Sequence, residues 1–242
     1  MLKFEKPDYK VTDYVESSSY GKFELEPLER GFGTTLGNAL RRVMLSSLPG
    51  SAITSVKIDG VMHEFQTIEG VIEDVTSIIL NLKGVVIKNH ASEETKTIKL
   101  NIKGAKVVTA GDFECDADIE IINKDHVIAT VSEGGSLVLE ATVGNGRGYV
   151  RCDEQKQYLG NTKVGVLPID SLYSPIERIS YEVENARVGQ NENYDKLIMN
   201  VWTNGAMKPE EAIALAGRIL IEHLEIITQI DSIADTKGLL NE

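Results

Sequence analysis

Apolar residues recur at helical spacing in residues 34–48. At about 100° per residue, one stripe falls within roughly 40° of its first member; it consists of Leu36, Leu40, Val43 and Ser47. A strand-like run ends before Gly31 and Gly33, and a proline stands beyond the stripe at Pro49. We therefore predict a helix that is capped by Thr34 or Thr35 and stops at the proline.

The opposite side of this predicted helix is mixed in character. Its residues lie about 140° to 240° from the stripe; they are Asn38, Arg41, Arg42 and Leu45. A solvated face with one exposed leucine is an ordinary arrangement. Arginine beside an apolar anchor also suits a protein interface. The spacing alone favours neither interpretation.

A last helix, predicted to begin at Pro209, is apolar on more than one side. One face holds Ile213, Gly217, Leu220, Leu224 and Ile227, and a second holds Leu215, Ile219, Ile226, Ile230 and Ile233. Such a helix is buried on more than one side. It is either the central helix of a large core or, as we expect, a helix that packs against a second copy in a symmetric homodimer.

The chain between these helices is rich in short alternating runs. Several strands separated by glycine turns are predicted within residues 52–143, with one amphipathic helix at residues 71–82. Lys83 follows at the negative end of that helix, where a cation is favoured. The pattern predicts an α+β fold in which the β-rich middle could be an insertion between two halves of another domain.

Charge and cysteine content narrow the function. The 37 acidic residues outnumber 25 basic ones, giving a net charge of −12, which disfavours broad contact with nucleic acid. No signal peptide or membrane-length apolar run is recognised. Cys115 and Cys152 form no metal or redox motif, so a reduced, cytoplasmic protein is the simplest expectation. A single disulfide between them stays an alternative.

Signals for catalysis are poor. Gly31, Gly33 and Gly37 precede a helix like a dinucleotide-binding turn, but Leu36 stands where that fingerprint requires glycine or alanine. No sequence context marks a nucleophile, a zinc site or a phosphate-binding loop. We therefore expect no catalytic residue, cofactor or metal in this chain.

Five collinear segments carry a family resemblance. They are ERGFGTTLGNALRR with LSSLPG (29–50), LNLKG (80–84), GRGY (146–149), YSPIERI (173–179) and TNG..KPEEAI (203–213). Together they resemble the amino-terminal domain of the bacterial RNA polymerase alpha subunit. This family is a non-catalytic part of DNA-directed RNA polymerase, a nucleotidyltransferase. The resemblance implies a homodimeric scaffold that binds the beta subunit and then beta-prime.

The resemblance also implies a domain plan. A dimerisation domain of sheet plus two long helices is expected from residues 1–49 and 173–233, interrupted by an inserted mixed, β-rich domain at 50–172. Residues 234–242 are expected to begin a flexible linker, with the family's carboxy-terminal DNA-binding domain absent and no direct DNA or membrane binding from this fragment. The expected dimer residues are Leu36, Leu40, Val43, Leu215, Ile219, Ile226 and Ile230.

Partner contacts follow from matching positions. The family uses the first helix against beta, which matches Arg42 and Leu45, and we add their neighbours Asn38 and Arg41. Positions that the family associates with the large subunits, chiefly beta-prime, match Lys83, Ile169 and Asp170; a helix-end cation and a turn are the alternative interpretation of these three. The competing function is a stand-alone dimeric enzyme or ligand-binding protein that uses the turn at Gly31 and Gly33.

Overall fold

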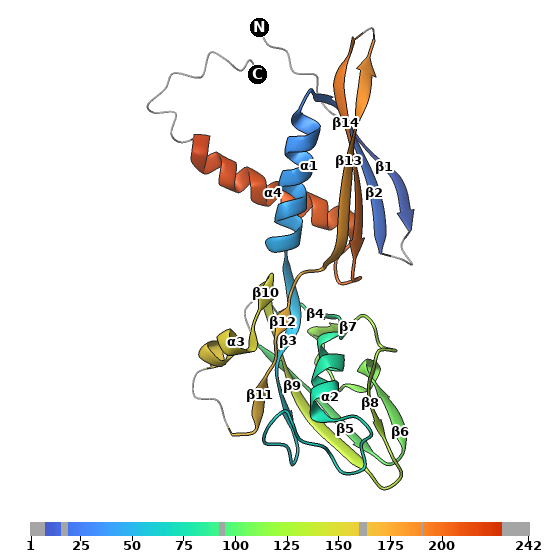
Figure 1. The fold of residues 1–242 in the computed structure, drawn as a ribbon, viewed down its shortest axis with the longest axis vertical. Helices are drawn as coiled ribbons and strands as arrows, with labels where there is room; N and C mark the ends of the chain where they lie inside the picture. The colour runs from blue at the N-terminus through green and yellow to red at the C-terminus, as the bar shows by residue number, and fades with distance from the viewer. Residues whose placement is uncertain (1–7, 16–18, 92–94, 160–163, 190, 229–242) are drawn as a thin grey trace. The chain divides into compact units, whose positions relative to one another are not determined.

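The computed structural model describes residues 8–15, 19–91, 95–159, 164–189 and 191–228 (Figure 1). It is an α+β fold in which strands predominate. The chain splits into two compact units: unit 1 is Met1–Leu48 with Pro175–Glu242, and unit 2 is Pro49–Ser174. The expected domain boundaries lay at residues 49/50 and 172/173. No helix within the described ranges is both long and apolar enough to cross a membrane.

Unit 1 is an antiparallel sheet covered on one face by two helices (Figure 1). The strand order is β1-β2-β14-β13. The long β13–β14 hairpin follows unit 2 in the chain, and its β14 pairs with β2 from the beginning of the chain. The bounds are β1 (Asp8–Val15), β2 (Tyr20–Glu29), α1 (Phe32–Ser46), β13 (Ile176–Val188), β14 (Asn191–Thr203) and α4 (Pro209–Thr228).

Unit 2 is built on a six-stranded sheet. Its path is β5-β9-β3-β4-β7, and β11 pairs with β3. These strands are β3 (Pro49–Ile58), β4 (Ile87–Asn89), β5 (Lys96–Lys103), β7 (Ile119–Ile121), β9 (Ser136–Arg147) and β11 (Val166–Pro168). Two small sheets pair β6 (Lys106–Thr109) with β8 (Val127–Val131) and β10 (Tyr149–Val150) with β12 (Ser171–Leu172), and the helices are α2 (Val75–Lys83), η2 (Ala110–Asp112) and α3 (Cys152–Leu159).

The start of α1 differs from the prediction. The helix begins at Phe32 with Gly31 as its N-cap in the left-handed region (φ 91°), and no cap side chain bonds to its amides. The hydroxyl of Thr35 instead donates to the Gly31 carbonyl at 3.1 Å. The prediction that Thr34 or Thr35 caps the helix is therefore wrong, because Gly31 lets the chain turn into the helix three residues before Thr34.

The buried stripe of α1 is also displaced from the predicted one. Its buried members are Gly33, Gly37, Leu40 and Met44. Leu36 and Val43, which were expected to be central, lie partly buried at the margin of the core. The two glycines went unrecognised as core positions because they carry no apolar side chain.

Two smaller expectations are corrected in unit 2 and in the cysteines. The helix predicted from residue 71 begins at Val75, because Asp74 caps it by accepting from the Ser77 amide at 2.7 Å. Cys115 and Cys152 are both free, so the alternative of a disulfide between them is wrong.

Candidate functional site

Helix α1 lies unusually close to strands β13 and β14. A Cβ added at Gly33 would meet Val183 Cγ1 at 2.7 Å, and one added at Gly37 would meet Tyr181 Cδ2 at 2.6 Å and Leu197 Cδ1 at 2.9 Å. Real Cβ atoms do not approach so closely, so both positions require glycine for this packing. These glycines serve helix–sheet contact, which differs from the cofactor turn considered for them.

The amino-terminal amides of α1 are bonded to a carboxylate from β14. Asp195 Oδ2 accepts from the Gly31 amide at 2.8 Å and from the Gly33 amide at 3.1 Å, and Asp195 is only 8% exposed. Amides at a helix start bind anions because they lack helical partners. Here the protein supplies its own anion, so the proposed phosphate- or ligand-binding turn is not favoured.

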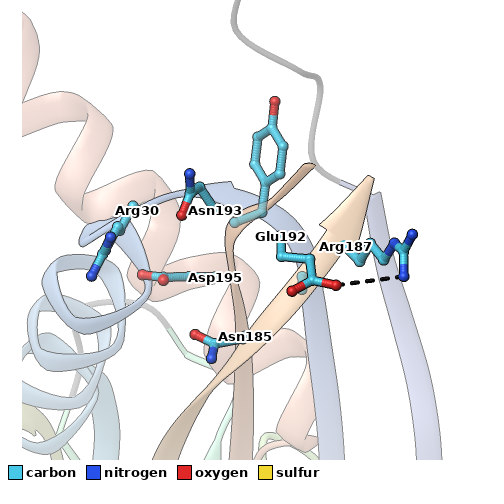
Figure 2. Close-up of a pocket in the computed structure, with 8 residues that line it drawn as sticks. Arg30, Asn185, Arg187, Glu192, Asn193 and Asp195 are labelled. Carbon is cyan, nitrogen blue, oxygen red and sulfur yellow. Dashed lines mark ion pairs between the residues drawn. The ribbon is translucent and has the colours of Figure 1, made fainter. Parts of the chain in front are cut away.

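A polar pocket of about 470 Å³ lies beside this carboxylate (Figure 2). Figure 2 shows Arg30 and Asp195 on one side and the exposed ion pair of Arg187 with Glu192 (3.5 Å) on the other. Among the described residues, no group of three or more potential metal ligands gathers here or elsewhere.

The outward face of α1 presents the residues assigned to beta binding. Asn38, Arg41, Arg42 and Leu45 are all exposed, with Leu45 at 38%. Asn38 and Arg42 line an open hollow that also includes Val43. Within the described ranges neither arginine forms an ion pair, so both guanidinium groups can bond to another molecule.

The residues assigned to dimer contact differ in how far their own chain buries them. Leu40 is 7% exposed and belongs to the core of its own chain. Leu36, Val43, Leu215 and Ile219 are partly buried at the edge of that core. Ile226 is 65% exposed, and Ile230 lies outside the described residues.

Further apolar residues are exposed on the second half of α4. Ile221, Leu224 and Ile227 are 57%, 55% and 60% exposed. In Figure 1 the carboxy-terminal half of α4 extends past α1 and away from the sheet. An apolar helix end left in the open is typical of a protein–protein interface.

The structure brings together two of the three residues assigned to the large subunits. Lys83 Nζ lies 2.7 Å from Asp170 Oδ2, whereas Ile169 is 1% exposed in the core of unit 2. The hydrogen bond from Lys83 is the largest influence that lowers the pKa of Asp170 to about 2, with the Cys152 amide next. Burial removes the Ile169 side chain from any contact surface of this unit.

Sequence reasoning missed the buried polar residues that hold these elements. Asp195 lies 162 positions from Gly33, to which it bonds. Gln155 is 5% exposed and donates to Ser171 Oγ and to the Tyr173 hydroxyl, each at 3.0 Å. No local pattern marks an aspartate or a glutamine whose partners lie in other elements of the chain.

Comparison with known proteins gives two findings. The family model described as the RNA polymerase Rpb3/RpoA insert domain matches residues 56–174, all within unit 2. The DNA-directed RNA polymerase subunit alpha of Symbiobacterium thermophilum is 52% identical over 242 residues, which is 100% of this chain and 76% of that protein. Identity of this level along the whole chain confirms the resemblance, and the chain belongs to the bacterial RNA polymerase alpha-subunit family.

Proposed function

We propose that this chain is an alpha subunit of DNA-directed RNA polymerase and acts as a homodimeric scaffold on which beta and beta-prime assemble. The observation that carries this proposal is the 52% identity over the whole chain to a protein named as that subunit. The chain then belongs to a nucleotidyltransferase without providing its active site. The same proposal places the protein in the cytoplasm, where a bacterial polymerase transcribes.

Dimerisation through α1 and α4 is supported by the unfinished core of unit 1. Leu36, Val43 and Leu220 are only partly covered at the margin of that core, and Leu224 and Ile227 stand in the open beyond it. A second copy would cover these residues with the same surface, as an isologous interface does. We expect an obligate contact of this kind to bury more than about 2,000 Å².

Binding to beta is assigned to the outward face of α1. Arg42 would donate charge-assisted hydrogen bonds to a partner carboxylate or carbonyl, and Leu45 would insert as the apolar anchor. Asn38 and Arg41 flank them on the same exposed face. Asn38 and Arg42 share a hollow with Val43. The beta surface and the dimer surface would therefore adjoin on one helix.

A substitution on α1 tests the beta surface. Arg42→Ala should leave the dimer intact but weaken beta binding by about 2–5 kcal/mol, because a buried charged partner would lose its hydrogen bonds. Arg218→Ala, which removes an exposed arginine of α4, is the matched control. Titration of beta against labelled dimer measures both variants. Wild-type affinity for Arg42→Ala would remove Arg42 from the interface.

Contact with beta-prime is assigned to the region of unit 2 around Lys83 and Asp170. Their side chains are partly exposed, at 32% and 26%. Ile169 is buried and its amide donates to the Thr54 carbonyl, so its part in this region would be to hold the chain next to Asp170. The order of assembly, beta before beta-prime, is part of the same proposal.

Co-expression with beta and beta-prime tests the function as a whole. We expect a complex that contains two copies of this chain and one of each large subunit, measured by native mass spectrometry. A preparation in which neither large subunit accompanies a folded dimer would overturn the scaffold role. That result would favour the alternative of a stand-alone dimeric enzyme or ligand-binding protein.

A further inference from the structure

One carboxylate joins two helices of unit 2. Asp170, which follows β11, accepts a hydrogen bond from Lys83 Nζ on Oδ2 at 2.7 Å and from the Cys152 amide on Oδ1 at 2.8 Å. Lys83 is the last residue of α2, and Cys152 is the first residue of α3. The Lys83–Asp170 pair therefore connects the end of one helix to the beginning of another.

Helix α3 has little else to hold its first turn. It spans eight residues of mostly polar sequence, CDEQKQYL, and a helix this short is unstable by itself. Among residues 152–157, the one buried side chain is Gln155, an amide that bonds to Ser171 and Tyr173. Within residues 152–157, polar bonds from Asp170 and Gln155, rather than burial of apolar surface, fix the start and the middle of α3.

The chemistry of the pair fits a device that orders its own chain. Lys83 directs its ammonium group to Asp170, and each Asp170 oxygen already accepts from a group within unit 2. A residue that binds a partner directly would be expected to have its charged group free to bond to that partner. Lys83 instead forms its ion pair with Asp170, the carboxylate that bonds to the first amide of α3.

We propose that Lys83 and Asp170 are positioning residues, which act in assembly by fixing α3 and do not themselves provide the contact energy. The assembly part of this inference rests on the proposed function. The structural part, that the pair holds the first turn of α3, concerns the dimer alone and can be tested without any partner.

The thiol of Cys152 reports on the first turn of α3. Burial raises the pKa of this thiol, and the negative charges of Asp153 and Asp170 raise it further. Removing the cation of Lys83 cannot lower that pKa, so electrostatics alone predicts slower alkylation in Lys83→Ala. Release of the helix start predicts faster alkylation. The two effects have opposite signs, which makes this variant decisive.

Alkylation by iodoacetamide at pH 8, followed by peptide mass spectrometry, tests the structural part. In Lys83→Ala we expect Cys152 to react roughly fivefold faster relative to Cys115, as loss of a helix cap would allow. Cys115 is an exposed thiol elsewhere in unit 2 and corrects for general loosening. Lys83→Arg should keep the wild-type ratio. An unchanged or lower ratio in Lys83→Ala would overturn the inference.

A double-mutant cycle tests the assembly part. If Lys83 acts only through Asp170, Asp170→Ala and the double variant should lose the same affinity for the large subunits, Lys83→Ala should lose no more than either, and Lys83→Arg should retain it. A double variant that loses the product of the two single losses would show that each residue contacts the partner independently. If the wild-type dimer binds no large subunit, the proposed function fails while the alkylation result stands.

Discussion

The two units handle apolar surface in different ways. Unit 2 encloses 25 buried apolar residues with four partly buried ones at the margin, whereas unit 1 has 12 and nine among the described residues. The six-stranded sheet and α2 of unit 2 close around their own core. Unit 1 leaves one side of α1 and α4 uncovered. This difference supports the proposal that another polypeptide completes the core of unit 1.

The helix starts of the two units differ less than their cores. Asp74 caps α2 from the adjacent position, while Asp195 and Asp170 reach α1 and α3 from distant segments. A cap supplied by a separate segment of the chain fixes where a helix lies as well as where it begins. Unit 1 uses this device on α1, which the proposed function assigns to assembly, and unit 2 uses it on α3.

Charging the open end of α4 should have the largest effect. Leu224→Glu with Ile227→Glu would place two carboxylates in the dimer interface, and each lost anchor costs about 2 kcal/mol. We expect the dissociation constant of the dimer to rise at least about a hundredfold, since each 1.4 kcal/mol is a tenfold change. Sedimentation velocity measures this constant. Ile72→Glu with Leu80→Glu is the matched control, because these residues are similarly exposed in unit 2. Equal effects of the two pairs would contradict an interface on α4.

Filling the close contact beneath α1 should have a smaller effect. Gly37→Ala would press a methyl group against Tyr181 and Leu197, and overpacking of this kind costs about 1–3 kcal/mol. Urea unfolding measures the loss. Gly217→Ala in α4 meets no atom within 4 Å and should be neutral or stabilising. If Gly217→Ala destabilised the protein and Gly37→Ala did not, the tight contact would not lie at Gly37.

Removing the distant cap of α1 ranks next. Asp195→Ala would leave the amides of Gly31 and Gly33 without their acceptor, for an expected cost of about 1–2 kcal/mol. Hydrogen exchange should show faster exchange in the first turn of α1 and no change in unit 2. Glu192→Ala, which breaks only an exposed ion pair, should change stability by less than about 0.5 kcal/mol.

Acid should expose the smallest of these effects, in unit 2. The pKa of Asp170 is lowered to about 2, so its stabilising bonds are present above its unfolded pKa near 4 and are lost as pH falls through 2. Asp170→Asn should therefore destabilise by about 1 kcal/mol at pH 6 and by less at pH 2.5, as followed by urea midpoints. A difference that does not narrow in acid would mean that the charge of Asp170 contributes little.

The sequence predicted helices more reliably than contacts between residues that are far apart in the chain. Helical periodicity identified both helices of unit 1 and the two-sided apolar character of α4, because spacing along one helix is a local property. It could not identify Asp195, whose bonded amides lie more than 160 positions away. It also placed Ile169 on a contact surface, although pairing of the neighbouring β11 with β3 carries that residue into the core.

The residues on the exposed face of α1 could be predicted from their angular positions on the helix, but the partner of that face could not. Asn38, Arg41, Arg42 and Leu45 are exposed, as their angular positions predicted. Whether another protein covers them depends on a surface that is not in this chain. Family membership, established by identity over all 242 residues, supplied the interpretation that spacing left open.

The mass of the isolated chain in dilute solution tests the central claim most directly. If the open side of unit 1 is closed by a second copy, sedimentation equilibrium should give twice the 26.6 kDa chain mass at low micromolar concentration. The Leu224→Glu and Ile227→Glu double variant should give the single-chain mass. A wild-type chain that sediments as a stable, folded monomer would contradict the account.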